Sequence, residues 1–207
     1  MTIRIAATGL TLALLFTANA PVLADTAGEA AATQPSTAPA PSFVPDDFDP
    51  PVLAEAEEFK LVPLGPDLVK IDFDAYMSSI EHLQTTFTRS TGWPREGITD
   101  ADAMQDMLTE QERFNTRKSF AYGVLTPDGS RERGSVYVSP SPVPGYDAVV
   151  RMWVTKAEYD AGFDAKLYQW VKDWIAAEWP FAKVAYPGRA IAWEKWDAMV
   201  AASHGGE

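Results

Sequence analysis

The most constraining feature of this chain is a change of hydrophobic period in its second half. Apolar residues alternate with other residues over 120–125 and 135–138, and Thr-Pro-Asp-Gly at 126–129 between them is typical of a tight turn. A third alternating run covers 148–154, and residues 164–178 then repeat with the period of a helix. This order predicts a β-hairpin, a third strand beside it and a helix packed on the resulting sheet.

Further elements are predicted on both sides of this unit. Thr99 followed by Asp102 is typical of a helix start, because the hydroxyl and the carboxylate satisfy free amides of the first turn. Pro180 ends the helix over 164–178. The remaining elements are a strand over 59–64, a helix that starts near Asp72 or Asp74, a strand over 182–186 and a short element within 191–200.

Composition limits the classes of function. A chain of 207 residues, 46% of them hydrophobic, can bury one full core, and we assign it to residues 59–200. The formal charge of -12 argues against a nucleic-acid partner, which needs a basic face. Without cysteine there is no disulfide, thiolate nucleophile or Cys-ligated metal, and with His82 and His204 far apart we expect no metal site.

Residues 1–24 have the parts of a signal peptide. Arg4 precedes an apolar run, and Val22-Leu23-Ala24 has the small residues of a cleavage site, so we expect cleavage after Ala24. The alternative is a membrane anchor, but polar residues and Pro21 dilute the apolar run. The mature protein is then periplasmic or secreted and is not inserted in the membrane.

Two terminal segments are predicted to be disordered. Residues 25–58 are rich in Ala, Pro, Thr and acidic residues and contain no Lys or Arg, a composition that buries too little surface to fold. We interpret them as a linker, and residues 201–207 as a disordered tail.

The order of these elements resembles the Gcn5-related N-acetyltransferase (GNAT) superfamily over about residues 59–196. The resemblance implies an α/β (α+β) fold of the acyl-CoA N-acyltransferase type, with a mixed, mostly antiparallel central sheet flanked by helices. In that fold the sheet diverges beside its fourth strand, here 149–154, to admit the donor. The resemblance also implies N-acetyltransferase activity, with acetyl-CoA or another acyl-CoA as donor and a small-molecule amine as acceptor.

The same resemblance assigns roles to individual residues. Trp153 and Val154 would offer backbone amides to the pantetheine arm of the donor, and Gly162 lies in the loop that would receive its pyrophosphate. Acid-base chemistry needs a base and an acid in the cleft, for which position suggests Asp147 or Arg151 and Tyr186. Asp147 can equally serve to open its strand, and Tyr186 can be a half-buried core aromatic.

Residues 156–164 depart from the GNAT pattern. The pyrophosphate loop of the family reads Arg or Gln, two residues, Gly, one residue, then Gly or Ala, because small residues let amides close on phosphates. Here Glu158, Asp160 and Asp164 bring negative charge to that place. The alternative is that these carboxylates stabilise the first turn of a helix. A degenerate loop leaves a second function open, an exported non-catalytic domain that binds a small ligand or an envelope partner.

Other candidate sites are less specific. His82 lies next to the apolar side of its helix and is interpreted as a polar boundary residue. Trp93-Pro94, Trp179-Pro180-Phe181 and Pro187-Gly188-Arg189 are candidates for an aromatic pocket with one cation. Hydrolase chemistry ranks last, because the sequence has neither Gly-x-Ser-x-Gly nor cysteine.

Overall fold

The computed structural model describes residues 42–205. The signal peptide predicted over 1–24, its cleavage after Ala24 and the linker as far as residue 41 lie outside the described residues. Between residues 42 and 205, no helix is both long and apolar enough to cross a membrane.

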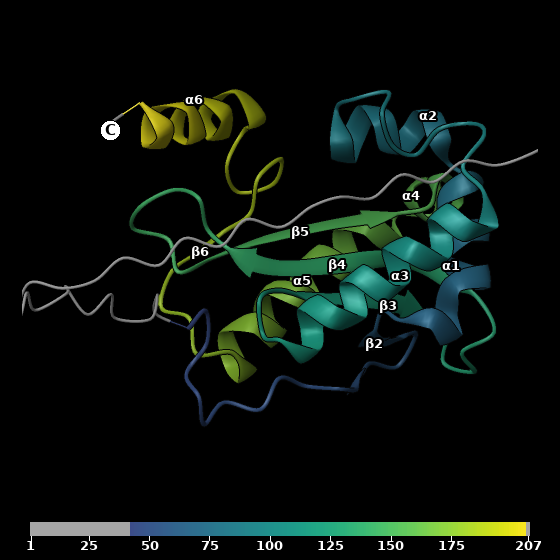
Figure 1. Ribbon diagram of the computed structural model, residues 1–207, viewed down its shortest axis with the longest axis horizontal. Coiled ribbons are helices and arrows are strands. Elements are labelled where there is room, and N and C mark those ends of the chain that lie inside the picture. The colour runs from purple at the N-terminus through teal and green to yellow at the C-terminus, as the bar shows by residue number, and fades with distance from the viewer. Residues whose placement is uncertain (1–41, 206–207) are drawn as a thin grey trace, which may run out of the picture. The chain divides into compact units, whose positions relative to one another are not determined.

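The centre of the protein is a sheet of six strands in the order β1-β2-β3-β4-β5-β6 (Figure 1). Neighbouring strands are antiparallel except the last pair, in which β6 runs parallel to β5. The strands are β1 (Ala54–Glu55), β2 (Lys60–Pro63), β3 (Phe120–Leu125), β4 (Glu132–Pro140), β5 (Ala148–Val154) and β6 (Val184–Ala185).

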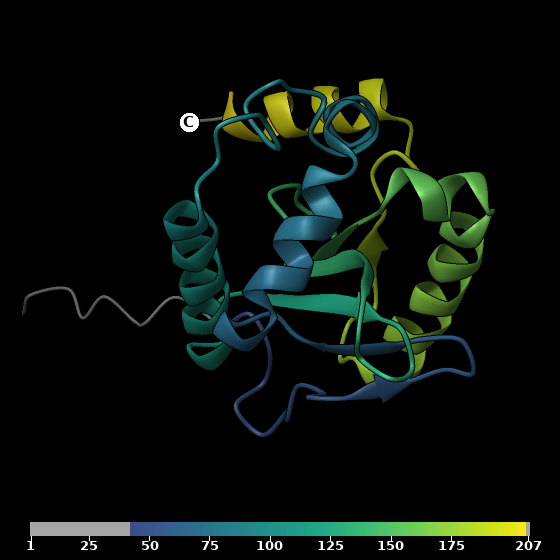
Figure 2. The same cartoon turned by 90° about the vertical axis from the view of Figure 1, so that its right-hand side faces the viewer.

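Helices cover both faces of the sheet (Figure 2). Helices α1 and α3 lie on one face and α5 on the other. Helices α2 and α6 both lie beyond β5, separated from each other along this strand (Figure 1). The helical segments are η1 (Pro66–Leu68), α1 (Val69–Met77), α2 (Ile80–Leu83), the π-helical turn η2 (Gln84–Thr88), α3 (Asp100–Asn115), α4 (Lys156–Asp160), α5 (Phe163–Glu178) and α6 (Trp193–His204). The mixed, mostly antiparallel sheet flanked by helices confirms the predicted fold class.

Local signals in the sequence account for several elements. The β3–β4 hairpin closes where the Thr126 amide donates to the Arg131 carbonyl at 2.9 Å, as the turn sequence predicts. Thr99 and Asp102 form the expected capping box at the start of α3. The single helix expected from Asp72 or Asp74 onward is wrong in its bounds, because α1 begins at Val69 and α2 is a separate short helix after Ser79.

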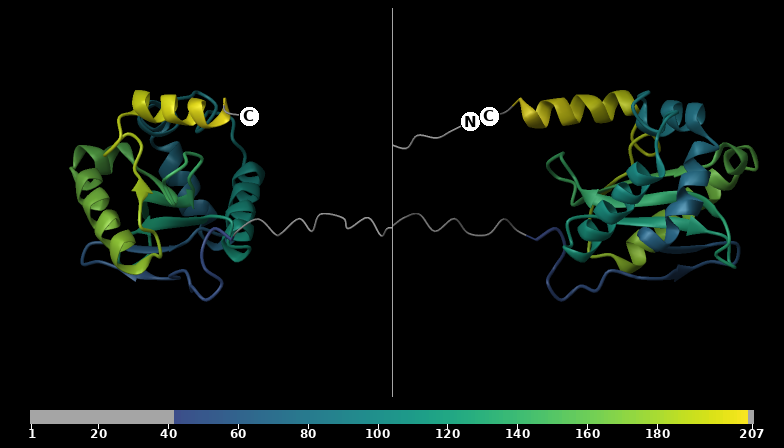
Figure 3. Two further views of the ribbon diagram at one scale, coloured as in Figure 1. Left: turned by 90° about the vertical axis from the view of Figure 1, so that its left-hand side faces the viewer. Right: turned by 45° about the vertical axis from the view of Figure 1, so that its right-hand side comes forward.

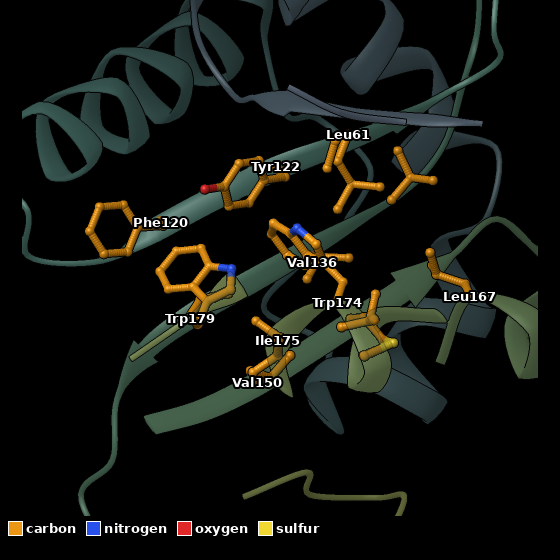
Figure 4. Packing of buried hydrophobic residues seen from close by; sticks show 14 of the residues in the cluster. Leu61, Phe120, Tyr122, Val136, Val150, Leu167, Trp174, Ile175 and Trp179 are labelled. Atoms are coloured by element: carbon orange, nitrogen blue, oxygen red, sulfur yellow. The ribbon is translucent and has the colours of Figure 1, made fainter. Parts of the chain in front are cut away.

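The largest core lies between the sheet and α5 (Figure 4). Val150, Met152 and Val154 of β5 face α5, whereas Trp153 points to the opposite face and packs with Tyr76 of α1. The alternation predicted for this strand is therefore confirmed. It sends Arg151 and Trp153 to the face that carries α1 and α3.

Residues 42–58 correct the prediction of a disordered linker. Ala54 and Glu55 form β1, which pairs with β2, and Val44 is only 1% exposed. The ring centroids of Phe48 and Trp179 are 5.3 Å apart. Figure 3 shows this segment running along one edge of the domain. A few apolar side chains in a Pro-rich stretch are enough to order it, because they fill gaps between large core aromatics.

The predicted C-terminal boundary is also wrong. Helix α6 continues to His204, so residues 201–204 are helical rather than a disordered tail. Trp196 anchors this helix by packing with Val143, Val149 and Ala185.

The position of Val44 leads to a stability prediction. Val44→Ala should lower the free energy of unfolding by about 2 kcal/mol, because it removes buried methyl groups and leaves a cavity. Val52→Ala is a matched control in the same segment, since Val52 is 68% exposed. Urea denaturation measures both. Equal stability of the two variants would show that residues 42–58 do not pack on the domain in solution.

Candidate functional site

Strands β5 and β6 pair over only two residues each. Ala148 pairs with Val184 and Val149 with Ala185. Asp147 holds this closed end, because its amide donates to the Lys183 carbonyl at 2.8 Å and its carboxylate accepts from the Lys183 amide at 2.8 Å. Beyond Val149, the β6 side of β5 has no strand partner within residues 42–205.

The turn after β6 leads the chain away from β5. Gly188 has a φ of 72°, and a Cβ at this position would lie 2.5 Å from the Trp193 ring. Only glycine suits both the left-handed backbone and the close approach of the indole. The turn and Trp193 thus form the wall opposite the free edge of β5.

A cavity of about 300 Å³ lies between that wall and β5. We call it the strand-edge cavity; His82, Arg151, Trp153, Val154, Arg189 and Trp193 are among its lining residues. A sheet that diverges beside its fourth long strand, with a cavity at the divergence, is what the resemblance predicts. The architecture is of the acyl-CoA N-acyltransferase type.

Helix α4 takes the place of the expected pyrophosphate loop. Thr155 caps it by accepting a hydrogen bond from the Glu158 amide at 3.3 Å. The Glu158 carboxylate is held by Arg131 at 2.8 Å and by Arg133 at 2.6 Å. Because the two guanidiniums donate to it, the pKa of Glu158 is below its usual value despite the opposing effect of burial.

The two other acids of this segment are also paired. Lys156 lies 2.6 Å from Asp160, and Arg189 forms a bidentate ion pair with Asp164 in the first turn of α5. Gly162 precedes that helix with a φ of 77° and open space around it. Glu158 and Asp164 lie in the first turns of α4 and α5, as the alternative interpretation from the sequence expected, whereas Asp160 ends α4 and is accounted for by its ion pair with Lys156.

A second cavity, of about 450 Å³, lies between α1, α3 and the sheet. We call it the acidic cavity, because Asp72, Asp106 and Glu110 line it. Phe87 and Arg151 line both cavities. The Arg151 guanidinium lies 4.5 Å from the Phe87 ring centroid and donates to the Phe87 carbonyl at 3.0 Å. These two residues therefore stand at the boundary between the cavities.

Asp72 and Glu132 form a buried carboxyl pair behind the acidic cavity. They are 4% and 1% exposed, and Ser135 donates to Glu132 at 2.7 Å. Burial raises the pKa of both groups, and at Glu132 the charge of Asp72 raises it further. Two neighbouring carboxylates that are both buried repel each other when both are charged, so the pair retains a proton near neutral pH.

His82 lies in the strand-edge cavity, although its position beside the apolar stripe gave no sign of this. Its ring centroid is 4.9 Å from that of Tyr159, which also lines this cavity. Desolvation, and then the charge of Lys156, lower its pKa, so the imidazole is neutral at neutral pH and can accept a proton.

The structure separates the residues predicted to act together. Trp153 and Val154 line the strand-edge cavity, whereas Gly162 lies outside its lining. Asp147 is exposed and holds β6. Tyr186 is buried, and its ring centroid lies 5.7 Å from that of Tyr168. Burial raises the pKa of Tyr186 to about 12. Neither Asp147 nor Tyr186 lines a cavity described above, so we assign acid-base chemistry elsewhere.

The three segments proposed as one aromatic pocket lie in different places. Trp93 lines the acidic cavity, Pro187, Gly188 and Arg189 line the strand-edge cavity, and Trp179 is part of the main core. Among the described residues, no group of three or more His, Asp or Glu side chains is arranged to hold a metal ion.

Comparisons with known proteins give likenesses of fold. No protein-family model and no curated protein matches the sequence. One similar solved structure is a protein assigned to the GnaT-family acetyltransferases of Bordetella pertussis, with 14% identity over 60% of this chain and 72% of that chain and a TM-score of 0.45. Another is the ribosomal-protein-S5-alanine acetyltransferase of Vibrio fischeri, with 16% identity over 60% and 67% and a TM-score of 0.48. The function of this chain is therefore inferred from its own cavities.

The Asp72–Glu132 pair predicts a pH dependence of stability. Burial raises the pKa of Asp72 from 3.8 to about 7 in the folded protein, so the folded state binds more protons than the unfolded state between these values. Stability should therefore fall as the pH rises from about 4 to about 7. Over this pH range the free energy of unfolding of the unaltered protein should fall by an amount on the order of 3 kcal/mol, and Asp72→Asn should abolish this fall.

Chemical denaturation at pH 4.5 and pH 8 measures the difference between the two proteins. Asp74→Asn is the control, because Asp74 lies on the same helix, is exposed and pairs with Lys70. An identical pH profile of Asp72→Asn and the unaltered protein would contradict a shared proton at this pair.

Proposed function

We propose that the protein transfers an acyl group from a pantetheine thioester, such as acetyl-CoA, to an amine. The single observation that carries the proposal is the free edge of β5 beside the strand-edge cavity, where β6 has diverged. Unpaired backbone groups on an edge strand bind an extended chain through main-chain hydrogen bonds. An acyl-pantetheine arm is such a chain.

The two halves of the cavity fit such a donor unequally. The free edge of β5, where Trp153 and Val154 line the cavity, suits the acyl-pantetheine arm. At the other half, Lys156 and Arg189 are the nearby cations, and each is already paired with an aspartate. Phosphates would compete with those carboxylates for the cations, so the nucleotide half of CoA should add little to affinity.

The donor supplies an acyl group activated as a thioester, and the chain supplies position and proton transfer. The uncharged amine forms a bond to the acyl carbon, the carbon–sulfur bond breaks with its electron pair on sulfur, and the proton lost by nitrogen ends on the thiolate. His82 accepts that proton first, because it lines the strand-edge cavity as a neutral imidazole. Arg151 supplies positive charge at the boundary where the acceptor approaches.

One observation favours a second function, ligand binding without catalysis. The ion pairs Lys156–Asp160 and Arg189–Asp164 occupy the groups that a phosphate would use. A domain on this fold that binds a small ligand or an envelope partner in the strand-edge cavity needs no free phosphate site. It differs from the first proposal by having no affinity for an acyl thioester.

The proposed function predicts donor binding that depends little on the nucleotide. Both acetyl-CoA and S-acetylpantetheine at millimolar concentration should raise the melting temperature, because a ligand that binds only the folded state stabilises it. The two Kd values should agree within about tenfold, which is 1.4 kcal/mol. No shift with either compound would exclude acyl transfer and leave ligand binding without catalysis.

Asp164→Asn is the diagnostic variant for this measurement. It releases Arg189 and removes a negative charge near the phosphate position, so affinity for acetyl-CoA should rise by about fivefold. Affinity for S-acetylpantetheine should not change. An equal gain for both donors would contradict the assignment of this end of the cavity to the phosphates.

A second prediction concerns proton transfer. His82→Gln should lower kcat for acetylation of a primary amine by about tenfold or more, because the neutral imidazole no longer accepts the proton. Tyr186→Phe is the control and should leave kcat unchanged, since Tyr186 is buried against Tyr168. Release of the free thiol gives the rate. A Tyr186→Phe enzyme slowed more than His82→Gln would reverse the assignment.

A further inference from the structure

The acidic cavity carries chemistry that the proposed reaction at β5 does not use. Its carboxyl groups face aromatic rings across a space of about 450 Å³. The Tyr76 and Trp93 rings are 5.1 Å apart, and those of Phe87 and Tyr137 are 5.7 Å apart. Aromatic faces and carboxylates together favour an organic cation over a neutral or anionic ligand.

The carboxyl groups of this cavity differ in what already neutralises them. Glu110 pairs with Arg113 at 3.1 Å, and burial raises the pKa of Asp72 and of Glu132, which favours their neutral forms. Asp106, at the exposed rim, has no ion pair or side-chain hydrogen bond among residues 42–205. A negative charge is therefore available at the α1–α3 side of the cavity.

A buried hydroxyl without a partner points to the same end. Tyr76 is 2% exposed and lines the acidic cavity, and its Oη has no hydrogen-bond partner within the described part of the chain. Tyr76 lines this cavity together with Asp72 and Asp106, and burial and then the charges of these acids raise the pKa of its hydroxyl. A buried polar group left unpaired destabilises a protein, and a ligand donor would satisfy it. An ammonium ion has three such donors.

Arg151 marks the other end of the cavity. Its Nε is buried without a partner, and no carboxylate pairs with it among the described residues. Asp72 meets Glu132 near Gly123 of β3 and Ser135 of β4, whereas Arg151 lies on β5 opposite Tyr137. From the strand spacing and the rise per residue, the Asp72–Glu132 pair and Arg151 lie on the order of 10 Å apart.

We propose that the acidic cavity binds the ammonium end of an aliphatic amine between Asp106 and the Tyr76 hydroxyl. This inference deepens the proposed function. Only one part rests on that function: if the protein transfers an acyl group, the acceptor is a diamine whose second nitrogen reaches Arg151. The guanidinium repels a second positive charge, so the nitrogen at the boundary of the cavities is uncharged. That is the form that attacks the thioester carbon.

Isothermal titration calorimetry on the full chain, without any donor, tests the cation site. Butylamine and 1,4-diaminobutane should bind, and 1-butanol, of similar size but uncharged, should bind at least about tenfold more weakly. Asp106→Asn and Tyr76→Phe should each weaken butylamine binding by about three- to tenfold. Glu112→Gln, on the same helix as Asp106, is the matched control and should bind butylamine like the unaltered protein. Equal binding of butylamine and 1-butanol would overturn the proposal.

Turnover with acetyl-CoA then separates the inference from the function on which it rests. We expect kcat/KM for 1,4-diaminobutane to exceed that for 4-amino-1-butanol by about tenfold, and Asp106→Asn to remove this preference. Butylamine binding with no acetylated product from any amine would support the cation site and overturn acyl transfer. Equal kcat/KM for both amines, unchanged by Asp106→Asn, would overturn the diamine and leave acyl transfer in place.

Discussion

The short ladder between β5 and β6 is the constraint on which the architecture of the site depends. Two residues of each strand pair, and the Asp147 carboxylate fixes the amides of Ala182 and Lys183 at the closed end. Past this point the chain turns at Gly188 and Trp193 packs on the turn, so β6 does not return to β5. A longer ladder would satisfy more backbone groups of β5 but would close the strand-edge cavity. The open edge is therefore a local loss of pairing that the surrounding packing maintains.

Much of the fold could be predicted from the sequence, because its signals are local. The turn at 126–129, the alternation over 148–154 and the Thr99–Asp102 cap each act within a few residues, and each has its counterpart in the structure. Helix α4 also has a local signal, since Thr155 and Glu158 have the spacing of a capping box, whereas the resemblance implies a loop at this place. The order of residues 42–58 depends on distant partners such as Trp179, which composition does not reveal.

The candidate site was harder to predict, because its residues come together only in three dimensions. Asp72 and Asp106 lie on different helices, and their shared cavity depends on how α1 and α3 pack on the sheet. His82 reaches the strand-edge cavity because α1 ends at Met77 and a short second helix follows. Acids that looked alike in the sequence also differ by partner: Glu158 is held by two arginines, while Asp72 meets another carboxyl group. Charge counted along the chain therefore says little about charge in a cavity.

The stacking of Trp193 on the Gly188 turn has a spectroscopic consequence. The indole forms part of the strand-edge cavity, and the Arg89 guanidinium lies 4.3 Å from its ring centroid on a side chain that also binds Asp197 of α6. Any molecule that enters between the turn and β5 changes the polarity around this ring. Indole emission is sensitive to that polarity, so the contribution of Trp193, one of seven tryptophans in the chain, should change when the space beside β5 is filled.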